Sequence, residues 1–261
     1  MPGTFFPALF CGEAADPNEL HEFQKLAVQV SVAAGKTIFS EGELADSVFG
    51  LSRGFVRLYK LLPDGRRQIL GFALPGDFLG MPIHDRHRLS ADAIGEVTLS
   101  RFSRIKLANF VLSSPNVLRL LMEFAARQLE MAQDQIALIG RISAEEKVSI
   151  FLVNWRSRLT RIAASSEAVP LPMPRRDIAD FVGLTLATIS RTFTKLEQRK
   201  AIRILPKAVM LTGLEQPPLL KGGTYDTHMS PHDPHEPTSS ASPTASEKCH
   251  EATLRVAIDR H

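Results

Sequence analysis

RRDIADFVGLTLATISRTFTK, residues 175–195, decides the fold of the C-terminal half of this 261-residue chain. Ile178, Ala179 and Val182 fall on one face of a predicted first helix, where they can pack inward. Gly183 follows, at the point where the chain needs a left-handed backbone to end one helix and start another at a steep angle. This pattern is typical of a helix-turn-helix, whose second helix enters the major groove of DNA.

The predicted second helix has two chemically different faces. Its N-cap is Thr185, and its buried stripe is expected to comprise Leu186, Ile189, Phe193 and Leu196. The opposite face carries short hydroxyl residues and cations, which suit base edges and phosphates. The residues expected to read bases are Ala187, Thr188, Ser190 and Arg191. Those expected to contact phosphates are Arg175, Arg176, Thr185, Thr194, Lys195 and Lys207.

An ordinary helical hairpin with a solvated face would show the same local pattern, and the distribution of charge favours DNA. Residues 146–215 contain 12 lysines and arginines against 6 acidic residues. Residues 1–145 contain 15 against 16, and the remainder contains 4 against 6. The basic excess therefore lies on the segment with the helix-turn-helix, as expected of a domain that binds phosphates.

Composition limits the class of protein. With 44% apolar and 23% charged residues, the chain is expected to be soluble and large enough for two modest domains. No apolar run approaches the roughly 20 residues that cross a bilayer, and the start lacks the basic region of a secretory signal. We therefore expect a cytoplasmic protein with no membrane partner. Cys11 and Cys249 lie near opposite ends, which does not predict a disulfide framework.

The N-terminal half has the rhythm of an antiparallel β-fold. From Gln29 to Phe102, apolar and β-branched runs alternate with glycine turn signals, and PDGR is predicted to be a hairpin turn. A β-roll or jelly roll is the expected architecture. The predicted strands are SVFGLSRG, FVRLYKLL, RRQILGFAL, RLSADAI and VTLSRF.

One long helix is predicted from Ser114, which can cap it, and Pro115, which suits the first helical position. Apolar residues then repeat at intervals of three and four over about six turns, with alanines near the middle. The helix could simply pack on its own β-domain, but the straight stripe favours a two-fold homodimer. Such a pair would place two recognition helices about 34 Å apart, one turn of B-DNA. The predicted seam comprises Leu118, Leu121, Ala125, Leu129, Ala132, Ile136 and Ile139.

Together, GDFLG at 76–80, the long helix, a hinge at RISAEEK and the helix-turn-helix make the chain resemble the CRP/FNR family of bacterial transcription regulators. The resemblance spans residues 20 to about 212 and is strongest to the FNR and FixK branch, which controls low-oxygen respiration, denitrification and nitrogen fixation. It implies an α+β fold, a wing at IRILPKAVMLT, an activator that binds double-stranded palindromic DNA as a homodimer, and contact with RNA polymerase.

The resulting domain prediction has four parts. A β-roll occupies 1–113, a dimerisation helix 114–142 and a winged helix-turn-helix 143–215. The remainder, 216–261, is rich in Pro, Ser, Thr, Gly and His and is expected to be a disordered tail. Its histidines are interpreted as incidental rather than as a metal site.

Family ligand sites can be compared with this sequence. In the family's cyclic-nucleotide pocket, a glycine-glutamate pair binds the ribose and an arginine-serine pair binds the phosphate. Here these places read Gly76-Asp77 and Arg88-Leu89-Ser90, and the shorter carboxylate and split pair argue against cAMP. Two cysteines cannot supply the four thiolates of an iron-sulfur cluster.

Haem is harder to exclude, because one histidine can hold an iron. The candidates are His21, His84 and His87, and the last two lie in a charged loop expected to be solvated. We therefore expect a FixK-type regulator with no cofactor and no metal, governed by its own abundance or by an upstream phosphorelay. The alternative is a sensor of the same family whose β-roll binds a cyclic nucleotide or haem.

The recognition helix departs from the FNR and FixK pattern at Ala187, where those proteins usually have a glutamate that can accept from a cytosine in a TTGAT-type half-site. Alanine offers at most a methyl contact, so the preference at that base pair is expected to be relaxed or altered. Ser190 and Arg191 match the family, and Arg191 is expected to bind guanine through two hydrogen bonds. No metal cluster, nucleophile elbow or phosphate-binding glycine loop suggests an enzyme.

Overall fold

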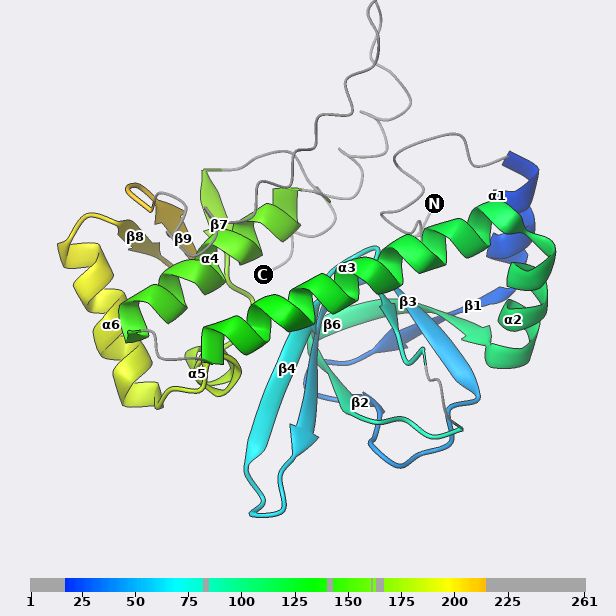
Figure 1. Ribbon diagram of the computed structural model, residues 1–261, viewed down its shortest axis with the longest axis horizontal. Coiled ribbons are helices and arrows are strands. Elements are labelled where there is room, and N and C mark those ends of the chain that lie inside the picture. Colours follow the sequence, from blue (N-terminus) through cyan, green and yellow to red (C-terminus); the bar gives the residue numbers. More distant parts are fainter. Residues whose placement is uncertain (1–16, 82–84, 140–142, 161, 163–166, 215–261) are drawn as a thin grey trace, which may run out of the picture.

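An antiparallel β-roll, a long helix and a small helical domain with its own sheet follow one another along the chain (Figure 1). The computed structural model describes residues 17–81, 85–139, 143–160, 162 and 167–214. The predicted α+β class and winged helix-turn-helix are confirmed. The predicted tail at 216–261, both cysteines and part of the hinge lie outside the described residues.

The β-roll is built around two long central strands. Its strands are β1 (Ala27–Val32), β2 (Thr37–Phe39), β3 (Ser47–Leu61), β4 (Arg67–Ala73), β5 (Phe78–Leu79) and β6 (Ser90–Ser103). All pairings are antiparallel, in the order β1-β6-β3-β4, with β2 on β6 and β5 on β3. The predicted PDGR turn joins β3 to β4, where the Leu62 amide donates to the Arg66 carbonyl at 2.8 Å.

Two glycines expected to end strands instead lie inside them. The predicted runs on either side of Gly54 form the single strand β3, and those on either side of Gly95 form β6. At this point the strand register jumps from Arg53 opposite Thr98 to Phe55 opposite Ile94, which is a bulge. Gly54 has φ +88°, and a Cβ there would lie 2.5 Å from the Glu96 carbonyl oxygen. The glycine therefore allows a close crossing of two strands rather than a turn.

Three helices follow or flank the roll: α1 (Pro17–Lys25), α2 (Arg104–Ser113) and α3 (Pro115–Ile139). As predicted, α3 begins at Pro115, and the Leu118 amide donates to the Ser114 carbonyl at 3.0 Å. Its first turns close a phenylalanine-rich core against α1 and the roll. The buried members of this core are Phe23, Val48, Phe78, Phe102, Leu107 and Phe124.

The C-terminal domain contains α4 (Ala144–Thr160), α5 (Arg175–Val182) and α6 (Leu186–Gln198) with a small sheet. The sheet comprises β7 (Ala168–Pro170), β8 (Ile202–Leu205) and β9 (Ala208–Leu211), in the order β7-β9-β8. The hairpin of β8 and β9 is the predicted wing. No helix among the described residues is both long and apolar enough to cross a membrane.

The two domains share one hydrophobic core. Ile69, Phe72 and Leu74 on and beside β4 are buried together with side chains of α4, α5 and α6. Trp155 on α4 lies at this junction, with its ring centre 6.0 Å from those of Phe55 and Phe72. The β3–β4 hairpin is therefore packed against the helix-turn-helix domain, which nothing local in the sequence predicts.

Candidate nucleic-acid interface

The helix-turn-helix is fixed by local chemistry at its turn. Gly183 ends α5 with φ 68° and ψ 41°, the left-handed conformation that glycine adopts most easily. The Leu184 amide then donates to the Ala179 carbonyl at 3.0 Å. Thr185 caps α6, because its hydroxyl accepts from the Thr188 amide at 3.1 Å. Both sequence predictions for this turn are confirmed.

The buried face of the motif holds the two helices together. Ile178, Ala179 and Val182 are buried on α5, as expected. On α6, Ile189, Phe193 and Leu196 are buried, but Leu186 is 49% exposed. The prediction that Leu186 belongs to the buried stripe is wrong, because the first residue of α6 lies beyond the contact between the helices. Its apolar side chain instead borders the exposed face of α6.

That exposed face contains the residues expected to read bases. Ala187, Ser190 and Arg191 are exposed, and Thr188 is half-buried with its hydroxyl 2.8 Å from that of Thr185. The Arg191 Nε donates to the Ala187 carbonyl at 3.3 Å. Within the described chain, no partner occupies its two terminal nitrogens. The guanidinium can therefore still present two parallel donors to a base edge.

The cations expected at phosphates have different surroundings. Arg176, Thr194 and Lys207 are exposed. Lys195 forms an ion pair with Glu145 at the start of α4, and Arg199 pairs with the same carboxylate. The hydrogen bond from Lys195 and the two positive charges lower the pKa of Glu145. Glu145 therefore joins the start of α4 to the side of α6.

Arg175 is directed into the domain rather than onto the surface of α6. Its guanidinium carbon lies 3.2 Å from the centre of the Phe193 ring. Burial lowers the pKa of Arg175 to about 10, so it remains charged at neutral pH. Its Nη1 is buried and has no hydrogen-bond partner among the described residues. Arg176, the next residue, is the exposed cation at the start of α5.

The first helix of the motif is bound to the β-roll by buried ion pairs, here named the Asp177 cluster: Arg57, Arg67, Asp177 and Asp180. Asp177 is 1% exposed, and its carboxylate accepts from Arg57 at 2.7 Å and from Arg67 at 2.5 Å. Arg67 also reaches Asp180 at 3.1 Å, and Gln68 donates to the Asp180 carbonyl at 2.7 Å. The sequence analysis did not predict this cluster. The one hint in the sequence was that Arg57 and Arg67 lie within predicted strands.

The place of the family's ribose-binding pair is occupied by an internal contact. The Asp77 carboxylate accepts from the Leu74 amide and from Arg158 of α4, both at 2.9 Å. Burial raises the pKa of Asp77, whereas the charge of Arg158 opposes that rise. The adjoining cavity of about 330 Å³ has no other charged lining residue in the described structure. Arg88, in the place of the phosphate ligand, is exposed and does not line it.

The histidines of the described residues lie apart from one another. His87 is 6% exposed and stacks on Phe39 with ring centres 4.0 Å apart, so the expectation of a solvated loop was wrong for this residue. Backbone hydrogen bonds to Gly42 and Glu43 hold it against the roll, and burial lowers the pKa of His87. His21 is exposed, and His84 lies outside the described residues. Within that description, no three metal-binding side chains meet.

The predicted seam on α3 is largely exposed. Leu118 is 44% and Leu129 61% exposed, and Ala125 and Ala132 are exposed beside them. Leu121 is partly buried against the phenylalanine-rich core. The side chains of Ile136 and Ile139 lie outside the described part. One position beyond Leu121, Met122 is 67% exposed and continues the line from Leu118 to Ala125 at intervals of four and three residues.

Comparison with known proteins matches both halves of the chain. The family model for the cyclic nucleotide-binding domain matches residues 29–114, and that for bacterial regulatory proteins of the crp family matches residues 171–202. The transcriptional activatory protein AadR of Rhodopseudomonas palustris is 54% identical over 199 residues, which cover 76% of this chain and 83% of AadR. The nitrogen fixation regulation protein FixK of Bradyrhizobium diazoefficiens is 51% identical over 196 residues, with 75% and 83% covered. The structure of FixK2 from Bradyrhizobium japonicum is similar with a TM-score of 0.66 and 36% identity, covering 71% of this chain and 92% of that one.

Proposed function

The chain belongs to the CRP/FNR family of bacterial transcription regulators, and from that premise we propose that it activates transcription by binding a palindromic DNA site as a homodimer. Its relatives named as activators or nitrogen fixation regulators support a role in low-oxygen or nitrogen metabolism. RNA polymerase is the partner that an activator of this kind requires.

The observation that carries the proposal is the exposed face of α6. Arg191 has two terminal nitrogens without a partner in the described chain, so it can form paired hydrogen bonds to guanine. Ser190 lies beside it, while Ala187 has no polar group with which to read a base. Arg176 and Thr194 are exposed nearby and suit phosphates, and Lys195 would exchange Glu145 for a phosphate oxygen.

The proposed dimer uses the exposed stripe of α3. Leucine and methionine side chains that are 44–67% exposed gain free energy when a second helix covers them. Alanines at 125 and 132 let two helices approach closely between the larger side chains. The proposed contact comprises Leu118, Met122, Ala125, Leu129 and Ala132, with Ile136 and Ile139 continuing it.

We place no effector beside Asp77. A cyclic phosphate needs an unpaired cation, and Arg158, the one cation among the described residues that line this cavity, already forms an ion pair with Asp77 at 2.9 Å. This supports regulation by abundance or by an upstream relay. Calorimetry with cAMP and with cyclic di-GMP tests it, and micromolar binding of either ligand would favour the sensor alternative.

Selection of DNA half-sites from a random pool tests the proposed function. The wild-type protein should enrich a two-fold symmetric sequence, with weak preference at the base pair that Ala187 faces. Arg191→Ala should remove the enrichment, since each paired contact to a base is worth about 1–3 kcal/mol. Lys195→Ala should instead lower the affinity for all DNA sequences by the same factor and reduce the dependence of that affinity on salt concentration. Recovery of the same palindrome by Arg191→Ala would refute this arrangement.

A further inference from the structure

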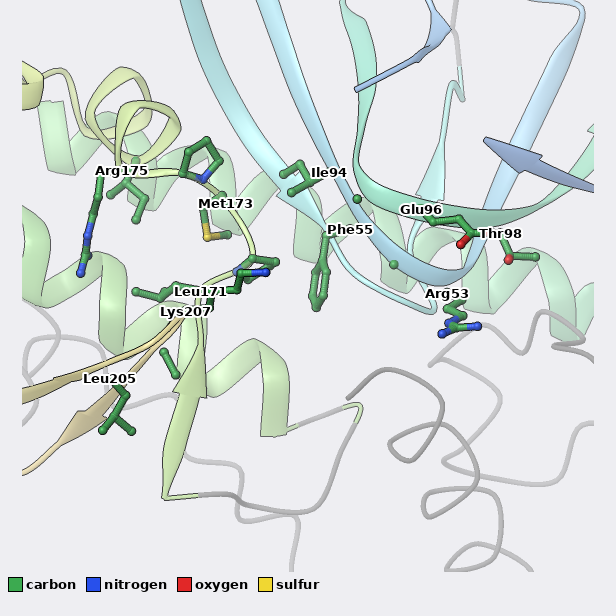
Figure 2. A pocket seen from close by; sticks show the side chains of 16 residues that line it. Arg53, Phe55, Ile94, Glu96, Thr98, Leu171, Met173, Arg175, Leu205 and Lys207 are labelled. Carbon is green, nitrogen blue, oxygen red and sulfur yellow. The ribbon is translucent and has the colours of Figure 1, made fainter. Parts of the chain in front are cut away.

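A second cavity, separate from the one beside Asp77, lies between the two domains (Figure 2). Its volume of about 520 Å³ is in the range of sites for small molecules. One wall is the bulge where β3 and β6 cross, with Phe55, Ile94 and Thr98. The other wall comes from the segment before α5 and from the wing. Neither domain alone encloses this space.

The charges around the cavity are mostly positive. Arg53 lies on the β-roll side, whereas Lys207 and Arg175 lie on the winged-helix side (Figure 2). Glu96 is the single acidic lining residue in the described structure. Arg53 and Lys207 form no ion pair or hydrogen bond with other described side chains, and the buried Nη1 of Arg175 also has no partner there. Arg53 and Lys207 therefore line the cavity without a protein anion, whereas the guanidinium of Arg175 is directed onto the Phe193 ring.

The remaining lining is apolar. Phe55 lies between the two walls in Figure 2, and Leu171 and Met173 face it from the winged-helix side. Bulges commonly direct side chains into sites of this kind, and domain junctions are common places for ligands. A ligand that fits would combine an apolar or aromatic body with a negative group.

We propose that this cavity binds a small organic anion, a carboxylate or phosphate ester with an apolar body, which contacts both domains at once. Arg53 and Lys207 supply the positive charge for the negative group from opposite walls, and Phe55 packs against the body. The proposal does not depend on which DNA sequence the protein reads. Because the ligand touches both walls, its binding stabilises the contact between the two domains.

The probe is 8-anilino-1-naphthalenesulfonate, an aromatic anion, compared with N-phenyl-1-naphthylamine, which has the same body without the charge. Fluorescence titration of the full chain should show one saturable sulfonate site per protomer. Each charge-assisted hydrogen bond is worth about tenfold in affinity, so Arg53→Gln and Lys207→Gly should each weaken the sulfonate by about tenfold. Binding of the neutral amine should change less than twofold.

Two features of the variants keep the result interpretable. Lys207 has φ 54° in the two-residue turn of the wing, so glycine removes the cation while easing the backbone. Arg203→Gln is the matched control, because Arg203 is an exposed arginine of β8 that does not line the cavity. Equal sulfonate affinity in wild type, Arg53→Gln and Lys207→Gly would overturn the proposal. The proposal would also be overturned if Lys207→Gly lost affinity for double-stranded DNA but kept its affinity for the sulfonate. Lys207 would then be a phosphate contact.

Discussion

Replacing Asp177 with asparagine should loosen the contact between the β-roll and the helix-turn-helix. Asp177 is 1% exposed and accepts hydrogen bonds from two arginines, whose side chains are 17% and 24% exposed. Removing one member of a buried ion pair typically costs about 3–5 kcal/mol. Arg57 keeps Asp92 at 3.6 Å and Arg67 keeps Asp180 at 3.1 Å, so we expect the lower end, about 3 kcal/mol.

Trp155 provides the measurement, because it is the single tryptophan of the chain and lies at the junction of the domains. Its fluorescence should shift to the red at lower urea concentration in Asp177→Asn than in wild type. In a thermal scan the same loss corresponds to a Tm lowered by about 6–12 °C, at roughly 2–4 °C per kcal/mol for a protein of this size.

Asp180→Asn is the matched control. Asp180 is 25% exposed, so its ion pair should contribute no more than about 1 kcal/mol. A double-mutant cycle of Asp177→Asn with Arg67→Gln should give a coupling energy of about 1.5–3 kcal/mol, whereas a cycle with the exposed Arg66→Gln should give none. Equal losses of stability in Asp177→Asn and Asp180→Asn would contradict this expectation. So would equal coupling energies of Asp177 with Arg67 and with Arg66.

Three further outcomes are expected. Ala187→Glu should shift half-site selection toward cytosine at one base pair by about 1–3 kcal/mol, and an unchanged selected site would contradict the assigned contact. Leu129→Lys should yield monomers in sedimentation, whereas Leu112→Lys, on an 80% exposed leucine of α2, should leave the assembly intact. Burial lowers the pKa of His87, so the folded state binds fewer protons than the unfolded chain, and Tm should fall as the pH drops below about 6.5. In His87→Gln this fall should be smaller, and an identical pH profile would show that another group is responsible.

The helix-turn-helix could be predicted because its determinants are local. A glycine that must be left-handed and a threonine that caps the next helix lie within three residues of each other, so sequence spacing alone places both helices. The start of α3 at Pro115 is local in the same sense. Local rules also explain the error at Gly54, since a glycine inside a bulge and a glycine in a turn look alike along the chain.

The contacts between the domains could not be predicted in this way. Arg57 and Asp177 are 120 residues apart, and no sequence pattern around either residue predicts that they form an ion pair. His87 was expected to be solvated because its neighbours in sequence are charged, yet it stacks on Phe39 of β2 and is buried. Leu186 fits the helical period of the buried stripe, but the neighbouring helix does not extend far enough to cover it.

The exposed stripe on α3 also bears on how the protein would respond to its own abundance. If two protomers cover that stripe together, the number of paired protomers depends on their total concentration. Well below the dissociation constant of the pair, a twofold rise in synthesis gives about a fourfold rise in dimers, because two chains must meet. A palindromic operator is bound by dimers, so at low occupancy the fraction of operator bound rises with the square of the protomer concentration. Uncovered leucines on one helix would thus convert a gradual change in gene expression into a steep switch without a bound signal.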